Sequence, residues 1–229
     1  MKAVIFDMDG VIINSEPLWQ IAEREVFSSL GVSVNDEFCE VTKTMTTTEV
    51  TKFWYDKSPW QNRSFYEVEQ MVVFRVIDLI EKRECSISGV KNFVTSLKSK
   101  GFKLGVATNS PFILIPVVLR KVGVTNFFDT ISSAESEENG KPDPAIYLRT
   151  SEKLNISPEN CIVIEDSYSG MLAAKRAGMT VVAFTNGNKE VNLTHADYKI
   201  DSFDGYNLEI FNEPTDNSKI PASRVLVAR

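Results

Sequence analysis

Short apolar runs and amphipathic stretches alternate along most of the chain. The apolar runs are rich in β-branched residues, which is typical of strands buried in a parallel sheet. They begin at Val4, Lys103, Thr130, Cys161, Met179 and Tyr198. Between them, apolar residues recur at the three-to-four-residue spacing of a helix. Strands that alternate with helices in this way predict an α/β fold with a doubly wound, mainly parallel sheet.

Residues 15–85 interrupt this alternation, because their apolar spacing is helical throughout. Ser15 stands where it can cap a helix, Pro17 falls in the first turn of that helix, and Gly31 closes it. A Thr-rich polar segment, an aromatic patch and a further helical stripe follow. We therefore expect an all-helical domain at 15–85, inserted into a core domain of residues 1–14 and 86–212. Residues 213–229 are polar and irregular, which predicts a C-terminal tail.

Two carboxylates, Asp7 and Asp9, come directly after the first apolar run. Charge at the end of a buried strand is costly unless it is paired or binds a metal. Residues two apart on a strand address the same region, and Gly10 leaves open backbone beside them. Hard oxygen ligands of this kind suit Mg²⁺. The alternative is that both side chains only solvate the turn after the strand.

Polar side chains also follow two later strands. Thr108 and Asn109 follow one, Glu165 and Asp166 follow another, and Lys141 lies in a loop predicted at the same edge of the sheet. Ligands of open α/β sheets bind outside the carboxyl ends of the strands. Taken singly, Thr108 and Asp166 fit helix N-caps and Lys141 fits a solvated loop lysine. With the paired aspartates, they form the set that phosphoryl transfer needs: a metal, donors for phosphate oxygens and a nucleophilic carboxylate.

Charge and composition exclude several classes of protein. The net charge of −6 and the sequence pI near 5.0 argue against nucleic-acid binding, which needs clustered Lys and Arg. No apolar run is long enough to span a bilayer, and we expect a cytoplasmic, monomeric protein without nucleic-acid or membrane partners. Cys39, Cys85 and Cys161 have neither metal-ligand nor disulfide-framework spacing, so they are interpreted as buried reduced thiols. His195, the single histidine, is interpreted as a surface residue.

The polar segments resemble the four motifs of the haloacid dehalogenase superfamily. The matching segments are residues 7–11, Thr108, Lys141 with Pro142, and residues 165–167. They span the core domain, and their joint occurrence is specific to this superfamily. This resemblance implies a Rossmann-like core in which Asp7 is the nucleophile and Asp9 is the general acid and base.

The same resemblance implies roles for the remaining polar side chains. Thr108 and Lys141 would hold the phosphoryl group, with Asn109 nearby. The implied cofactor is Mg²⁺, and its implied ligands are Asp7, the backbone carbonyl of Asp9, and Asp166, with Glu165 supporting the metal or its waters.

The helical insertion resembles the α-helical cap of the β-phosphoglucomutase-like branch of this superfamily. We expect Lys43 and Thr44, in its polar loop, to contact the substrate. Mutases of this branch carry an arginine in that loop where this chain has Thr47, which favours hydrolysis over mutation. Residues 14–19, 53–60 and 107–111 are similar to sugar-phosphate phosphatases of the 2-deoxyglucose-6-phosphate or hexitol phosphate type.

The predicted function is Mg²⁺-dependent hydrolysis of a small phosphate monoester, a sugar or polyol phosphate, through an aspartyl phosphate on Asp7. The first alternative is a sugar phosphomutase, in which Lys43 would have to hold a second phosphate without the bidentate fork of an arginine. A dehalogenase would not need the metal cluster. A phosphorylated receiver module would be about half this length and lack the cap, and an inactive binding protein would be expected to have lost one of the motifs.

Overall fold

The structure is a computed structural model that describes residues 2–35, 41–42 and 45–205. The chain divides into two compact units, one formed by Met1–Ile13 with Ser86–Arg229 and the other by Asn14–Cys85. We call them the core unit and the helical unit. The predicted tail at 213–229 and the predicted substrate residues Lys43 and Thr44 lie outside the described residues.

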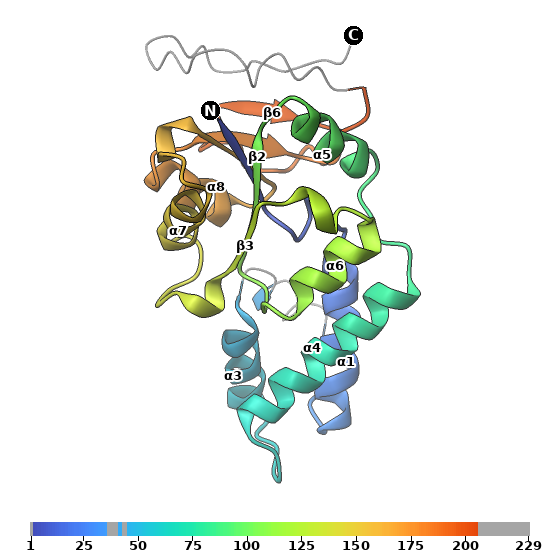
Figure 1. Ribbon diagram of the computed structural model, residues 1–229. Coiled ribbons are helices and arrows are strands. Elements are labelled where there is room, and N and C mark those ends of the chain that lie inside the picture. The colour runs from blue at the N-terminus through green and yellow to red at the C-terminus, as the bar shows by residue number, and fades with distance from the viewer. Residues whose placement is uncertain (1, 36–40, 43–44, 206–229) are drawn as a thin grey trace. The chain divides into compact units, whose positions relative to one another are not determined.

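Six strands within the described residues form one parallel sheet in the core unit (Figure 1). They are β1 (Ala3–Phe6), β2 (Lys103–Thr108), β3 (Thr130–Ser133), β4 (Cys161–Glu165), β5 (Thr180–Phe184) and β6 (Tyr198–Ile200). The strand order is β3-β2-β1-β4-β5-β6, which confirms the predicted doubly wound sheet. In this order the chain reverses direction across the sheet beside β1, and ligands bind at that topological switch point.

Helices cover both faces of the sheet. α5 (Val90–Ser99) and α6 (Leu114–Val122) lie on one face, and α7 (Ala145–Leu154) and α8 (Tyr168–Arg176) lie on the other (Figure 1). Short 3₁₀ turns, η1 (Thr125–Phe127), η2 (Ala134–Ser136) and η3 (Pro158–Asn160), complete the connections.

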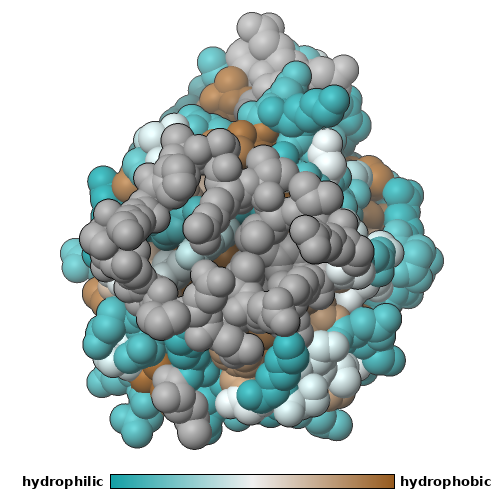
Figure 2. Space-filling model, turned by 90° about the horizontal axis from the view of Figure 1, so that it is seen from above, coloured by the Kyte–Doolittle hydropathy of each residue, from teal (hydrophilic) through white to brown (hydrophobic). Residues whose placement is uncertain are grey.

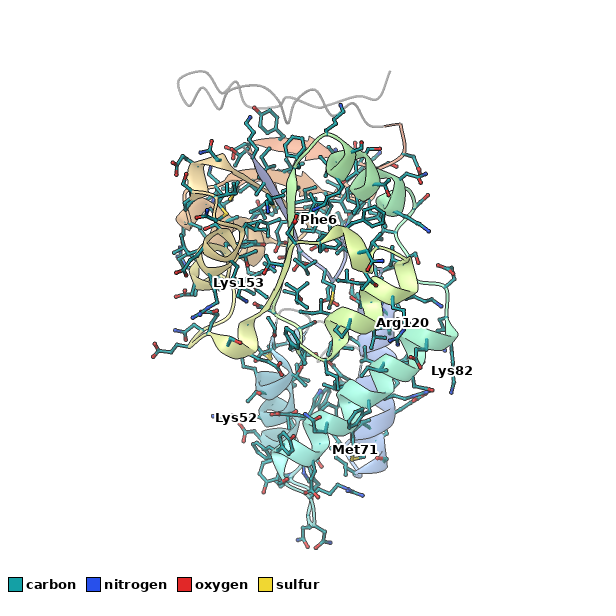
Figure 3. The ribbon with its side chains drawn as sticks, viewed as in Figure 1. Phe6, Lys52, Met71, Lys82, Arg120 and Lys153 are labelled. Carbon is teal, nitrogen blue, oxygen red and sulfur yellow. The ribbon has the colours of Figure 1, made fainter. Side chains whose placement is uncertain are left out.

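Alternate side chains of β1 pack into the two apolar layers that these helices cover. Phe6, labelled in Figure 3, makes an edge-on contact with Phe93 of α5, with ring centroids 6.1 Å apart. Ile5 belongs instead to the cluster that contains Tyr147 of α7 and Met171 of α8. Because the two residues that precede Asp7, Ile5 and Phe6, are buried on opposite faces of the sheet, the end of β1 is fixed from both sides.

The helical unit contains α1 (Glu16–Ser29), α3 (Thr47–Lys57) and α4 (Phe65–Lys82), so the described part of the predicted insertion is helical as expected. Its apolar stripes meet, with Phe27 and Trp54 both buried and their rings 6.0 Å apart. Capping boxes start α3 and α4, in which Thr46 pairs with Glu49 and Ser64 with Glu67. Lys52 on α3 and Met71 and Lys82 on α4 mark these helices in Figure 3.

Three expectations about single side chains can be compared with the structure. Ser15 occupies the N-cap position of α1, but its side chain makes no capping hydrogen bond. Cys85 and Cys161 are buried free thiols, as predicted, whereas Cys39 lies outside the described residues. His195 is partly exposed, as expected of a surface residue, but its ring packs 4.9 Å from that of Tyr168 and its Nε2 atom is buried without a hydrogen-bond partner among the described residues.

The surface has the mixed character of an ordinary globular protein. On the face shown in Figure 2, hydrophilic residues predominate around the margin, with hydrophobic residues scattered among them. Among the residues that the structure describes, no helix combines the length and the apolar character needed to cross a membrane.

Candidate active site

The predicted site residues of the core unit meet at the carboxyl ends of three adjacent strands. Asp7 directly follows β1, Thr108 ends β2 and Glu165 ends β4. β1 pairs with β2 on one side and with β4 on the other, so their ends lie next to each other. Asp7, Thr108 and Glu165 are 6%, 1% and 0% exposed. The sheet therefore buries two carboxylates and a hydroxyl at its switch point.

Lys141 joins the ends of these strands. Its Nζ atom donates to Asp7 Oδ1 at 2.6 Å, to Glu165 Oε1 at 2.7 Å and to the backbone oxygen of Ala107 at 2.9 Å. These acceptors match the three donors of an ammonium group. Burial lowers the pKa of Lys141, but the attraction of Asp7 and Glu165 outweighs burial and holds that pKa well above its ordinary value. The interpretation of Lys141 as a solvated loop lysine is therefore wrong.

Glu165 is held by donors on both of its oxygens. Oε1 accepts from Lys141 Nζ and, at 2.9 Å, from the hydroxyl of Tyr147 on α7. Oε2 accepts from the backbone N–H of Ser167 at 3.0 Å and from its hydroxyl at 2.9 Å. Gly170 allows the close approach of α8, because a Cβ atom there would lie 1.7 Å from Oε1. Four accepted hydrogen bonds use the full acceptor capacity of a carboxylate.

Asp7, Glu165 and Asp166 form a group whose carboxylate oxygens lie within 4.8 Å of one another. Burial raises the pKa of Asp7 to about 8, although Lys141 opposes the shift, and burial and Glu165 raise that of Asp166 well above its ordinary value. Among the described residues, neither the Asp166 carboxylate nor the Oδ2 atom of Asp7 has a hydrogen-bond or ion-pair partner, since Lys141 engages only Asp7 Oδ1. Clustered carboxylates that lack sufficient positive charge fit a divalent cation with oxygen ligands.

The side chain of Asp9 has different partners from those of Asp7. Its Oδ2 atom accepts from the hydroxyl of Thr108 at 3.1 Å and from that of Ser110 at 2.7 Å. Thr108 Oγ1 in turn accepts from the backbone N–H of Ser110 at 3.0 Å. The Asp9 carboxylate thus lies among hydroxyl groups, outside the cluster that suits a metal, so any metal contact of Asp9 would have to use its backbone carbonyl.

The capping alternatives for two of these residues are wrong. α6 begins at Leu114 with Ile113 at the N-cap position, so Thr108 caps no helix. Ser167 caps α8 by accepting from the Gly170 N–H, which leaves Asp166 outside the cap.

Asn109 connects the β2 edge of the site to the lysine loop. Its Oδ1 atom accepts from the backbone N–H of Lys141 at 2.9 Å. A Cβ atom at Gly140 would lie 3.0 Å from this same oxygen, so the loop approaches Asn109 closely. The Asn109 side chain therefore fixes the loop that carries Lys141.

Ser110 and Tyr147 contribute to the site but were not identified from the sequence. Ser110 follows Thr108 by two positions, and this repeat of a hydroxyl in a turn after a strand is a usable signal. The sequence alone marks Tyr147 only as one apolar position at the spacing of a helix. A buried tyrosine needs a hydrogen-bond partner, and this requirement could have indicated a polar neighbour without naming Glu165.

This fold and these side chains define a class of protein: an enzyme with a buried, charged site at the switch point of an α/β sheet. The chain belongs to the haloacid dehalogenase-like hydrolase family, whose model matches residues 4–184. It is 37% identical to hexitol phosphatase B of Escherichia coli over 87% of this chain and 91% of that protein. It is 35% identical to a phosphorylated carbohydrates phosphatase of Thermotoga maritima over 78% of this chain and 82% of that protein.

A solved structure has the same fold along almost the whole chain. The β-phosphoglucomutase of Clostridium difficile superposes with a TM-score of 0.80 and 28% identity, covering 95% of this chain and 98% of that one. The sequence and structure comparisons therefore agree on the family, and they include both phosphatases and a mutase.

Proposed function

We propose that this enzyme is a Mg²⁺-dependent phosphatase that hydrolyses small sugar or polyol phosphates through an aspartyl phosphate on Asp7. The observation that carries the proposal is the arrangement around Asp7, in which Lys141 engages one carboxylate oxygen and leaves the other without a hydrogen bond among the described residues. A carboxylate held on one side and open on the other is suited to act as a nucleophile. The two phosphatases among the relatives support the substrate class.

The first half of the proposed reaction transfers the phosphoryl group to the enzyme. The Asp7 carboxylate attacks phosphorus, the bond from phosphorus to the ester oxygen breaks, and Asp9 gives its proton to that leaving oxygen. Thr108 and Lys141 provide donors for the phosphoryl oxygens. For this, the Thr108 hydroxyl must turn its single proton away from Asp9, and Lys141 must redirect one of its three hydrogen bonds. The buried position of these donors strengthens their attraction for phosphate.

The second half returns the enzyme to its starting state. The Asp9 carboxylate takes a proton from water, the water oxygen attacks phosphorus, and the bond from phosphorus to Asp7 breaks. Ser110 holds the Asp9 carboxylate by its hydrogen bond to Oδ2, so the same group is in place for both proton transfers. The products are the alcohol and inorganic phosphate.

Asp7 and Asp166 are the side chains that would hold Mg²⁺, with the backbone carbonyl of Asp9. Bound Mg²⁺ would lessen the repulsion between the Asp7 carboxylate and a phosphate dianion. Glu165 fits a supporting role, because its oxygens are already engaged by Lys141, Tyr147 and Ser167. We further infer that residues 15–85 act as the substrate-selecting cap.

A phosphomutase is the second candidate, and the similarity to a β-phosphoglucomutase favours it. Thr47, the residue that replaces the arginine of the mutases, is the first residue of α3. A threonine brings no positive charge for a second phosphate. We therefore favour hydrolysis.

The test is phosphate release from a panel that contains 2-deoxyglucose 6-phosphate, hexitol phosphates and β-glucose 1-phosphate, with Mg²⁺ and again with EDTA. We expect Mg²⁺-dependent release of inorganic phosphate from the hexose or hexitol monoesters. Conversion of β-glucose 1-phosphate to glucose 6-phosphate without phosphate release would replace the proposal by the mutase. Release that chelation leaves unchanged would refute the metal assignment.

A further inference from the structure

Tyr147 is a fully buried residue of α7 that contacts two charged groups of the site. Its hydroxyl donates to Glu165 Oε1 at 2.9 Å, and its ring centroid lies 4.9 Å from the Nζ atom of Lys141. The aromatic ring packs in the apolar cluster that includes Ile5 and Met171. Tyr147 thus joins the core between the sheet and α7 to the ion pair of Glu165 and Lys141.

The Lys141 and Glu165 side chains form an ion pair, and further hydrogen bonds restrict the movement of both. All three donors of the Lys141 ammonium have acceptors, and each Glu165 oxygen accepts two hydrogen bonds. Removal of one donor from Glu165 Oε1 would leave Lys141 as the single donor to that atom among the described residues. The attraction between the two charges would then increase, because a less satisfied carboxylate oxygen attracts the remaining donor more strongly.

We propose that Tyr147 is a positioning residue for phosphoryl binding: its hydroxyl and ring hold Glu165 and Lys141 so that the ammonium can turn a donor from the protein to a phosphate oxygen. This inference rests on the proposed function, because phosphoryl binding is the task given there to Lys141. Tyr147 itself touches no reacting atom. Its effect passes through Glu165 to Lys141.

A purely structural role makes a different prediction. If Tyr147 served only as a core side chain, phenylalanine would replace it well, since the ring and most of its packing would remain. If the hydroxyl positions the ion pair, Tyr147→Phe changes phosphate binding in a folded protein. The expected change is about tenfold, the scale of one hydrogen bond to a charged group.

Thr150→Val is a matched control on the same helix. Thr150 is fully buried, and its hydroxyl donates to the backbone oxygen of Ile146 at 2.7 Å. This hydrogen bond involves neither Glu165 nor Lys141. Valine has nearly the same shape, so both variants remove one buried hydroxyl from α7. They differ in whether that hydroxyl is linked to Glu165.

The experiment measures the affinity of the full chain for inorganic phosphate by titration calorimetry at saturating Mg²⁺, together with kcat/KM and the melting temperature. We expect Tyr147→Phe to bind phosphate about tenfold more weakly and to lose kcat/KM by a similar factor. Thr150→Val should keep both values within about twofold. Equal phosphate affinities in the two variants would overturn the inference, whatever their melting temperatures.

A double-mutant cycle tests whether Tyr147 acts through the lysine. In a Lys141→Met background, Tyr147→Phe should have no further effect on phosphate affinity, because the group that it positions is gone. An undiminished tenfold effect in that background would also overturn the inference. If Tyr147→Phe does not fold, Ser167→Ala replaces it, because it also removes a hydroxyl donor from the Glu165 carboxylate and by the same reasoning should weaken phosphate binding; an unchanged phosphate affinity would overturn the inference. Failure of the proposed function is distinct, since the unaltered enzyme would then release no phosphate from any monoester.

Discussion

Replacement of Gly170 by alanine tests whether Glu165 is as rigidly held as the structure indicates. A Cβ atom at this position would lie 1.7 Å from Oε1, 2.0 Å from Cδ and 2.4 Å from Oε2 of Glu165. The carboxylate cannot turn aside without losing hydrogen bonds from Lys141, Tyr147 or Ser167. Gly170→Ala must therefore displace either α8 or the Glu165 side chain.

The expected loss in the free energy of unfolding combines one favourable term with two unfavourable ones. Alanine is favoured over glycine in a helix by about 1 kcal/mol. Overpacking of a well-packed site costs about 1–3 kcal/mol, and the loss of a hydrogen bond to a charged group costs about 1.5–3 kcal/mol. The net loss is about 1.5–5 kcal/mol. For a chain of this size, the melting temperature should fall by about 3–20 °C.

The assay compares Gly170→Ala with Ser169→Ala by thermal unfolding and by phosphate release. Ser169 lies in the same turn of α8, so its replacement gains helix propensity without adding an atom near Glu165. We expect the control to keep its stability within about 0.5 kcal/mol. The reasoning is refuted if Gly170→Ala is as stable as the control and retains the same kcat/KM.

Three further predictions concern the aspartates. Because burial raises the pKa of Asp7 to about 8 in the folded state, the metal-free protein loses stability from this group as the pH rises from about 4 toward 8. A proton on Asp7 also competes with Mg²⁺, so calorimetry should show the apparent Mg²⁺ affinity rising by up to about tenfold per pH unit below pH 8. A Mg²⁺ affinity that does not change between pH 6 and 8 would count against this competition between a proton and Mg²⁺ at Asp7. Ser110→Ala should lower kcat by about threefold to tenfold with little change in KM, because Asp9 loses its 2.7 Å hydrogen bond; an unchanged kcat would contradict the role of Ser110.

The fold was accessible from the sequence because hydrophobic spacing determines both the strands and their burial. The run that begins at Val4 is buried on both faces, which is why it is continuously apolar and not alternating. The meeting of Asp7, Thr108 and Glu165 was also predictable, since all three lie at the carboxyl ends of strands that form one edge of the sheet. Strand order could not be read from periodicity alone.

The detailed contacts of the site depend on tertiary packing that no local pattern encodes. Tyr147 and Glu165 are 18 positions apart and meet because α7 packs across the sheet. The same holds for the bond between Asn109 and the backbone of Lys141, 32 positions away. Lys141 could be assigned a role, but its engagement of three acceptors could not be foreseen. Helix capping was a reasonable alternative for Thr108 because the start of α6 was uncertain from sequence by a few residues.

The most direct test of the central claim is the turnover of Asp7→Asn on the best substrate of the panel, with its fold checked by circular dichroism. Asparagine keeps the size of the side chain and an oxygen for Lys141, but an amide is not a comparable nucleophile. The account predicts that kcat falls by at least about a thousandfold in a folded protein. Turnover within about tenfold of the unaltered enzyme would contradict the covalent mechanism.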